Sequence, residues 1–293
     1  MRSPFRWRAA AGALLLLAGA CRGGGDRPIR VGSKNFTEQV ILGEIAAQAL
    51  ERAGLKVERK LDLGGSFVCH RALVAGELDL YPEYSGTAFT AILKQKPIAD
   101  PDRVRERVSA EYARQWGLVW APPLGFENTF ALVMRADQAR QLQVAKISDL
   151  ARHPELRPGF GYEFVERADG FPGLAAAYGL AFAGRPAEMD LGLLYPALAQ
   201  GKVDVVAGNS TDGLIAAMQL AVLEDDRRYF PPYEAAFVVR DAAWKNARVR
   251  GALEPLSGTI TADAMRRMNA AVDRDGRRPA DVAREFLSRG RDH

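Results

Sequence analysis

Apolar residues follow two alternating rhythms in the first third of the chain, one typical of strands and one typical of helices. Residues 29–33 form a short apolar run, and the apolar positions of residues 37–54 recur with the period of an amphipathic helix. Residues 56–63 alternate like a strand, residues 64–77 continue as a helix after two glycines, and residues 78–84 form a third strand. Alternating strands and helices predict a parallel α/β sheet covered by helices.

The same order returns in the second half of the chain. Residues 159–164 are expected to form a strand, and residues 171–180 a helix with a proline near its start. Residues 193–202 have helical spacing, and residues 203–210 form a strand that runs into a loop. The pattern therefore predicts a second α/β unit.

An internal repeat supports two similar units. Residues 72–86 align with residues 197–211 at one constant offset, and each segment contains a helix end, a glycine turn, an aspartate and a β run. Tyr84 and Asn209 then occupy equivalent positions after a strand. Ligands of open parallel sheets lie beyond the carboxyl ends of the strands, so both residues are expected to face a cleft between two lobes. The matching pairs are Ala72 and Ala197, Leu73 and Leu198, Gly76 and Gly201, Asp79 and Asp204, and Ser85 and Ser210.

The C-terminal segments are expected to return to the first lobe. Residues 231–244 contain a strand, Thr261 is a candidate N-cap for the next helix, and Pro279 opens a last helix. The second lobe is then inserted into the first, and two crossover segments permit a hinge. The expected boundaries are 29–127 and 232–293 for the first lobe and 128–231 for the second.

The N-terminus has the features of a secretory signal. Three arginines precede a short apolar stretch that ends in small residues, and Cys21 follows directly. Residues 1–21 are interpreted as this signal and residues 22–28 as a flexible tether. Cleavage before Cys21 with lipid attachment and cleavage by the ordinary signal peptidase both fit. Either way, the sequence predicts a periplasmic or extracytoplasmic protein.

Composition narrows the class of protein further. The chain has 293 residues, of which 26% are charged, and a net charge of +4. No basic run is interleaved with aromatic residues, so nucleic acid is not an expected partner. Cys69 is the one cysteine beyond the signal, which excludes an internal disulfide, and a buried apolar role is favoured for it.

The sequence does not favour an enzyme. The three histidines lie at positions 70, 153 and 293 without metal-ligand spacing, so no metal and no cofactor are expected. A phosphate-binding glycine loop and a nucleophile elbow are also missing from the sequence. The alternative is a cleft hydrolase or lyase that uses Glu83 or Asp79.

Several ordered motifs together resemble one known family. The segments "VGSKNFTEQVILGEI", "LGGSFVCHRAL", "DLYPEYSGTAFTAIL", "RADGFPGL" and "FPPYEAAFVV" are similar to the osmoprotectant-binding proteins of ABC importers, the glycine betaine, carnitine and choline receptors. The similarity is greatest to the branch of stress-linked betaine-binding paralogues. It implies a bilobal, type II periplasmic-binding-protein (Venus-flytrap) fold. It also implies a monomer that binds a small quaternary ammonium solute and docks on permease subunits.

The resemblance also implies roles for particular residues. A trimethylammonium group donates no hydrogen bond and is recognised by aromatic faces, whereas a carboxylate needs cations and donors. The positions that match the aromatic cage are Tyr84, Phe130 and Tyr233, and those that match the carboxylate site are Lys34, Thr87 and Arg167.

Asn209 departs from the family pattern because it stands where relatives have a fourth cage tyrosine. One aromatic wall is therefore missing, which predicts either weak betaine binding or a different, larger cationic solute. Local roles compete with ligand contact at two positions: Arg167 could pair with Asp169 or Glu163, and Thr87 could cap a helix. A sensory role without transport is a further alternative.

Overall fold

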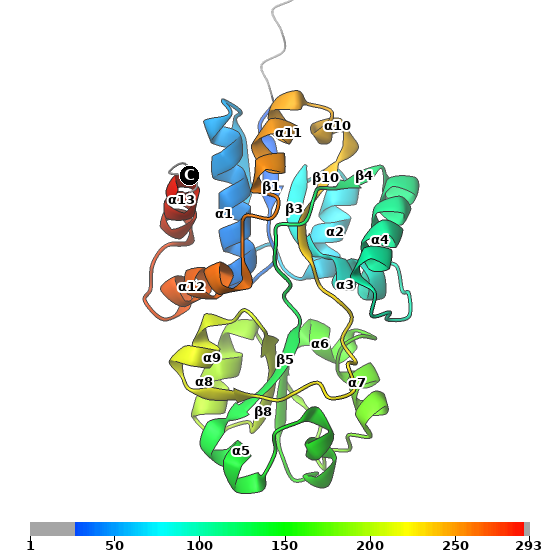
Figure 1. Ribbon diagram of the computed structural model, residues 1–293, viewed down its shortest axis with the longest axis vertical. Coiled ribbons are helices and arrows are strands. Elements are labelled where there is room, and N and C mark those ends of the chain that lie inside the picture. Colours follow the sequence, from blue (N-terminus) through cyan, green and yellow to red (C-terminus); the bar gives the residue numbers. More distant parts are fainter. Residues whose placement is uncertain (1–26, 290–293) are drawn as a thin grey trace, which may run out of the picture.

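The computed structural model describes residues 27–289, which form two α/β lobes (Figure 1). The expected signal, Cys21 and most of the tether lie outside the described residues. The first lobe has a five-stranded mixed sheet in which β1 pairs in parallel with β2 and β3, and β10 runs antiparallel to β3 and β4. Its strands in spatial order are β2 (Val57–Lys60), β1 (Ile29–Gly32), β3 (Leu80–Tyr84), β10 (Ala235–Arg240) and β4 (Leu118–Trp120).

The second lobe repeats this topology. Its strands in spatial order are β7 (Ala187–Met189), β6 (Pro158–Gly161), β8 (Val205–Asn209), β5 (Phe130–Arg135) and β9 (Leu220–Val222), and β5 runs antiparallel to both of its neighbours. Tyr84 pairs with Ala235 at the end of β3, and Asn209 pairs with Phe130 at the end of β8. The two residues thus hold the same place in the two sheets.

The repeated aspartates tie each sheet at its opposite end. Asp79 accepts hydrogen bonds from the backbone nitrogen of Arg30 (2.9 Å) and from its Nε (3.2 Å). Asp204 accepts the equivalent pair from Arg157, at 3.0 and 2.8 Å. Their recurrence in the sequence therefore reflects sheet assembly, because both lie at the strand starts, away from the tyrosine and the asparagine.

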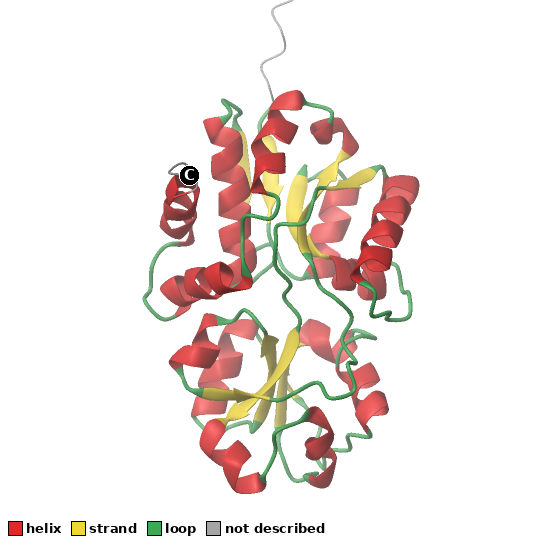
Figure 2. Ribbon diagram, viewed as in Figure 1, coloured by secondary structure: helices red, strands yellow, loops and turns green. Residues whose placement is uncertain are grey.

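Helices cover both faces of each sheet (Figure 2), and the strand residues alternate between two apolar layers. Phe237 and Val239 face the layer that contains the first helix, whereas Val238 faces the opposite layer. The helices of the first lobe are α1 (Thr37–Arg52), α2 (Ser66–Val74), α3 (Ser85–Thr87), the π-helical turn η1 (Ala88–Ile92), α4 (Pro101–Trp116), α10 (Asp241–Trp244), α11 (Ala247–Leu253), the 3-10 helix η4 (Glu254–Leu256), α12 (Ala262–Asp273) and α13 (Pro279–Arg289).

The helices of the second lobe are shorter. A strand over 159–164 was expected, and this is wrong in its second half, because β6 ends at Gly161 and a helix begins at Tyr162. The helical turn buries Phe164 against Phe160 at a centroid distance of 5.0 Å, and local strand-like alternation does not report such packing. The helices are α5 (Ala136–Leu142), η2 (Ile147–Arg152), α6 (Tyr162–Glu166), α7 (Phe171–Tyr178), η3 (Leu191–Leu193), α8 (Leu194–Ala199) and α9 (Gly213–Ala217).

Two chain segments join the lobes, one between β4 and β5 and one between β9 and β10 (Figure 1). They pair with each other where they cross: Glu127 and Glu234 form an antiparallel bridge, and the backbone nitrogen of Asn128 donates to the oxygen of Tyr233 at 3.1 Å. A paired double crossover of this kind can bend while it keeps the two lobes in register.

Candidate functional site

The ends of β3 and β8 and both crossover segments border one cavity between the lobes, with a volume of about 180 Å³. The sequence predicted seven residues for a site at this place, and the structure brings all seven to the wall of this cavity. They are Lys34, Tyr84, Thr87, Phe130, Arg167, Asn209 and Tyr233.

The two tyrosines are buried, and each places its ring at the cavity and its hydroxyl on a carboxylate. Tyr84 donates to Oε1 of Glu38 at 2.6 Å, and Tyr233 donates to Oδ2 of Asp169 at 2.7 Å. Burial raises the pKa of both phenols well above 10, and the neighbouring carboxylates add to this effect. Both hydroxyls therefore stay protonated and act as donors.

Phe130 connects the rings of the two lobes. It lies at the start of β5, where its ring is 5.8 Å from that of Tyr233 at an interplanar angle of 78° and 4.8 Å from that of Phe164. The guanidinium of Arg167 lies 5.1 Å from the centroid of Phe130. The edge-to-face arrangement gives the cavity two aromatic walls that stand nearly perpendicular to each other.

Arg167 is held by groups from both lobes. Its Nε and Nη2 donate to the two oxygens of Asp169 at 2.9 and 2.5 Å, and Nη2 also donates to Oγ1 of Thr87 at 3.2 Å. Burial favours a neutral Asp169, but the charge of Arg167 and the hydrogen bonds outweigh burial and lower the pKa of this carboxyl. The expected local pairing of Arg167 with Asp169 and its place at the cavity thus occur together.

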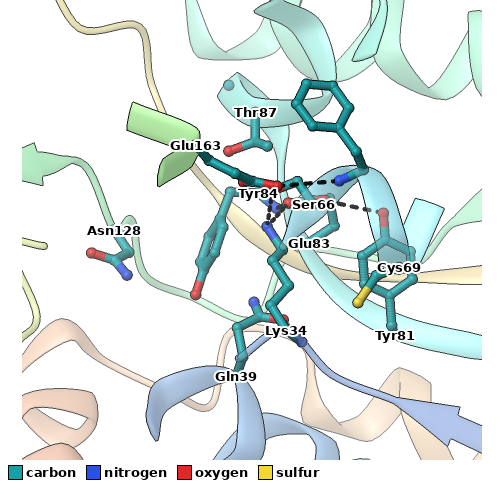
Figure 3. A network of polar contacts seen from close by, with 12 residues as sticks. Lys34, Gln39, Ser66, Cys69, Tyr81, Glu83, Tyr84, Thr87, Asn128 and Glu163 are labelled. Carbon is teal, nitrogen blue, oxygen red and sulfur yellow. Dashed lines mark hydrogen bonds and ion pairs between the residues drawn. The ribbon is translucent and has the colours of Figure 1, made fainter. Parts of the chain in front are cut away.

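Lys34 lies in a buried polar network at the start of α1 (Figure 3). Its Nζ forms an ion pair with Glu83, donates to Oγ of Ser66 at 3.1 Å, and lies 4.8 Å from the centroid of Tyr84. Glu83 also accepts from the hydroxyl of Tyr81 at 3.0 Å. An ammonium has three donors, so Lys34 keeps one for another partner.

Asn209 is half-buried at the end of β8 and is held by the next turn. Its backbone nitrogen donates to Asp212 at 2.8 Å, while its side-chain amide makes a long contact of 3.4 Å with the same carboxylate. Burial raises the pKa of Asp212 to about 6. Asn209 also borders a neighbouring cavity of about 510 Å³, so the missing aromatic wall lies where two cavities meet.

The cavity has further lining residues that the sequence reasoning missed. Phe36 stacks beside Tyr84 with a centroid distance of 6.4 Å and an interplanar angle of 21°. It stands in the same "GSKNFTE" motif as Lys34, so the motif itself offered the signal. Phe164, Glu163 and Asn128 also border the cavity, but their positions depend on the helical turn α6 and on the crossover, which the local pattern did not reveal.

The residues of the enzymatic alternative have other partners. Glu83 is fully buried and paired with Lys34, and Asp79 lies at the start of β3, where two arginines bind it. Neither lines the cavity between the lobes. Within residues 27–289, no cluster of histidine, cysteine, aspartate or glutamate could hold a metal ion. A search of the same residues finds no helix long and apolar enough to span a membrane.

Comparison with known proteins identifies the family. Residues 27–289 match the model of the substrate-binding domain of ABC-type glycine betaine transport systems, OpuAC. A glycine-betaine-binding protein of Pseudomonas aeruginosa is 35% identical over 275 residues, which cover 88% of this chain and 86% of that protein. The ergothioneine transport permease/ergothioneine binding protein EgtU of Helicobacter pylori is 34% identical over 90% of this chain, which spans about half (48%) of that longer protein.

Solved structures agree with this assignment. A crystal structure described as a glycine betaine/carnitine/choline ABC transporter is 32% identical and has a TM-score of 0.71 over 89% of this chain and 98% of that one. The expected bilobal, type II binding-protein fold is therefore confirmed, as is the resemblance drawn from the motifs. The chain belongs to the family of substrate-binding domains of ABC-type glycine betaine transport systems.

Proposed function

We propose that this chain is the extracytoplasmic solute receptor of an ABC importer and that it binds a quaternary ammonium zwitterion between its lobes. One observation carries the proposal: aromatic rings and buried cations from both lobes border the same cavity. Contacts from both lobes favour the closed form once solute is present, because a ligand shifts a hinge equilibrium only through its differential contacts.

The rings suit the methylated end of such a solute. A trimethylammonium group offers no hydrogen-bond donor, and each aromatic face contributes about 0.5–2 kcal/mol depending on its exposure. Tyr84, Phe130 and Tyr233 are assigned to this end, and Phe36 and Phe164 extend the same wall. These two rings offset part of the loss at Asn209.

The cations suit the carboxylate end, although each already has a carboxylate of the protein beside it. Lys34 is paired with Glu83 and Arg167 with Asp169, and each cation keeps donors that these pairs do not use. Glu163 adds an uncompensated negative charge at the cavity wall, 4.0 Å from Arg167. The site as a whole therefore favours solutes with zero or positive net charge over anions.

Titration calorimetry with glycine betaine, carnitine, choline and ergothioneine tests the proposal. Saturable 1:1 binding of at least one of these compounds is expected, with zwitterions bound more tightly than choline because Lys34, Thr87 and Arg167 contact the carboxylate. Absence of binding across the four compounds would overturn the proposal. Choline bound as tightly as betaine would remove the carboxylate site.

We also propose that the mature chain is exported, remains monomeric and docks on permease subunits of its importer. Cys21, directly after the apolar segment, is the assigned point of lipid attachment. The mass of the mature protein purified from its own membranes tests this: a diacylglyceryl group on Cys21 is expected. An unmodified N-terminus at this residue would exclude the anchor and leave the receptor function unchanged.

A further inference from the structure

Glu38 is a buried carboxylate that collects four hydrogen bonds directly behind the aromatic wall. It lies in the first turn of α1 and is 1% exposed. Oε1 accepts from the hydroxyl of Tyr84 (2.6 Å) and from Nδ2 of Asn128 (2.8 Å). Oε2 accepts from Oγ1 of Thr211 (2.5 Å) and from Nδ2 of Asn269 (3.1 Å). These donors come from β3, a crossover segment, the second lobe and α12.

The charge of Glu38 is not compensated by a cation. Within residues 27–289, no lysine or arginine forms an ion pair with it, whereas Asp169, behind the other cage tyrosine, is paired with Arg167. Burial raises the pKa of Glu38 above 4.5, and the four hydrogen bonds oppose this effect. A carboxylate surrounded by four donors matches the ionised, acceptor-only form.

This arrangement acts on the ring of Tyr84. A short hydrogen bond to an ionised acceptor is among the stronger kinds, and it polarises the donor in a low-dielectric interior. Withdrawal of the phenol proton towards Glu38 makes the ring face more negative, which is the property that attracts a cation. The ring already has a cation beside it, since Nζ of Lys34 lies 4.8 Å from its centroid.

We propose, on the basis of the solute-binding function above, that Glu38 determines the selectivity of this site for a quaternary ammonium over a neutral group of the same shape. It acts through the hydroxyl of Tyr84 and through its own uncompensated charge, without contact with the solute. Glu38 is therefore a specificity-determining residue one layer behind the cage.

A purely structural role makes a different prediction. The bond from Thr211 ties Glu38 to the second lobe, so a simple latch would favour closure around any ligand equally. The matched ligand pair is glycine betaine and 3,3-dimethylbutyrate, in which a carbon atom replaces the charged nitrogen. A latch affects both ligands alike, and only the proposed role changes their ratio.

Glu38→Gln is the test variant, because glutamine keeps the shape and removes the charge. The fold can accommodate it: Asn128 and Asn269 each have a buried Oδ1 without a partner in the described residues, and rotation of either amide lets it accept from the new side chain. Melting curves confirm the fold before binding is measured. Thr211→Val is the matched control, because it removes a donor to Glu38 and leaves the charge and the Tyr84 bond in place.

Dissociation constants are measured by competition calorimetry for both ligands in each variant. In Glu38→Gln we expect the preference for glycine betaine over 3,3-dimethylbutyrate to shrink by roughly five- to tenfold. The preference is expected to stay constant in Thr211→Val. Tyr84→Phe, which keeps the ring, should reduce it in part and make the further effect of Glu38→Gln smaller.

An unchanged preference in Glu38→Gln, or an equal loss for both ligands, would refute the role of Glu38 and leave the receptor function intact. A wild-type protein that binds no quaternary ammonium compound would instead refute the proposed function itself.

Discussion

Replacing Asn209 with tyrosine is expected to restore the missing aromatic wall and to tighten the binding of glycine betaine. Asn209 lies where cavities of about 180 and 510 Å³ meet, so a ring has room to enter from this position. The side-chain amide gives up little, because its contact with Asp212 is long at 3.4 Å, whereas the 2.8 Å bond from the backbone nitrogen remains.

The expected gain follows from one added aromatic face. A cation–π contact of about 0.5–2 kcal/mol corresponds to roughly 2- to 30-fold tighter binding, since about 1.4 kcal/mol is a factor of ten. Calorimetry of wild type, Asn209→Tyr and Asn209→Leu with glycine betaine measures it. Leucine fills space without a π face, so an equal gain in that variant would show that cavity filling is the cause. Affinity that falls or stays constant with tyrosine means that Asn209 is not the missing wall.

Three further predictions concern the same site. Tyr84→Ala should weaken quaternary ammonium binding at least about tenfold, because it removes one ring and frees a buried acceptor; calorimetry that shows unchanged affinity excludes Tyr84 from the site. Lys34→Met should lower the free energy of unfolding in urea by about 3–5 kcal/mol, since it strands Glu83 in the core, and adding Glu83→Gln should recover most of it; a loss below about 1 kcal/mol contradicts the buried pair. Burial raises the pKa of Asp212 from 3.8 to about 6, so its contribution to stability is complete below about pH 4 and is lost as the pH rises through about 6. Relative to Asp212→Asn, wild type should therefore lose up to about 3 kcal/mol between about pH 4 and 7, and parallel stability curves for the two proteins would contradict this shift.

The sequence contained enough information to predict the fold and the position of the site. Hydrophobic periodicity located most strands, and the repeat placed Tyr84 and Asn209 at equivalent strand ends, where the register of both sheets has them. The lipid anchor at Cys21 stays a prediction, because this residue lies outside the described part of the chain. The lobe boundaries and the ligand contacts also stay predictions.

The charge state of the site could not be predicted from the sequence. Lys34 pairs with Glu83 across 49 positions, and Tyr84 reaches Glu38 across 46 positions. Such pairings arise from the order of strands in the sheet and leave no trace in local periodicity. The two cations of the site therefore came out of the sequence as unpaired charges, and the carboxylates beside them are visible only in the folded chain.

Local alternation also misled at the wall of the second lobe. Residues 159–164 read as one strand, yet Phe164 reaches the core through a helical turn, and this turn presents Glu163 to the first lobe. A short segment cannot show which of two periods its burial follows, because only one or two apolar positions sample the period.

A crystal structure of the protein with glycine betaine, or with whichever quaternary ammonium compound binds most tightly, tests the central claim most directly. We expect the methylated nitrogen within about 6 Å of the ring centroids of Tyr84, Phe130 and Tyr233. The carboxylate should lie within hydrogen-bond distance of Lys34 or Arg167. A ligand bound outside the cavity between the lobes, or one whose methyl groups touch none of the three rings, would contradict the account.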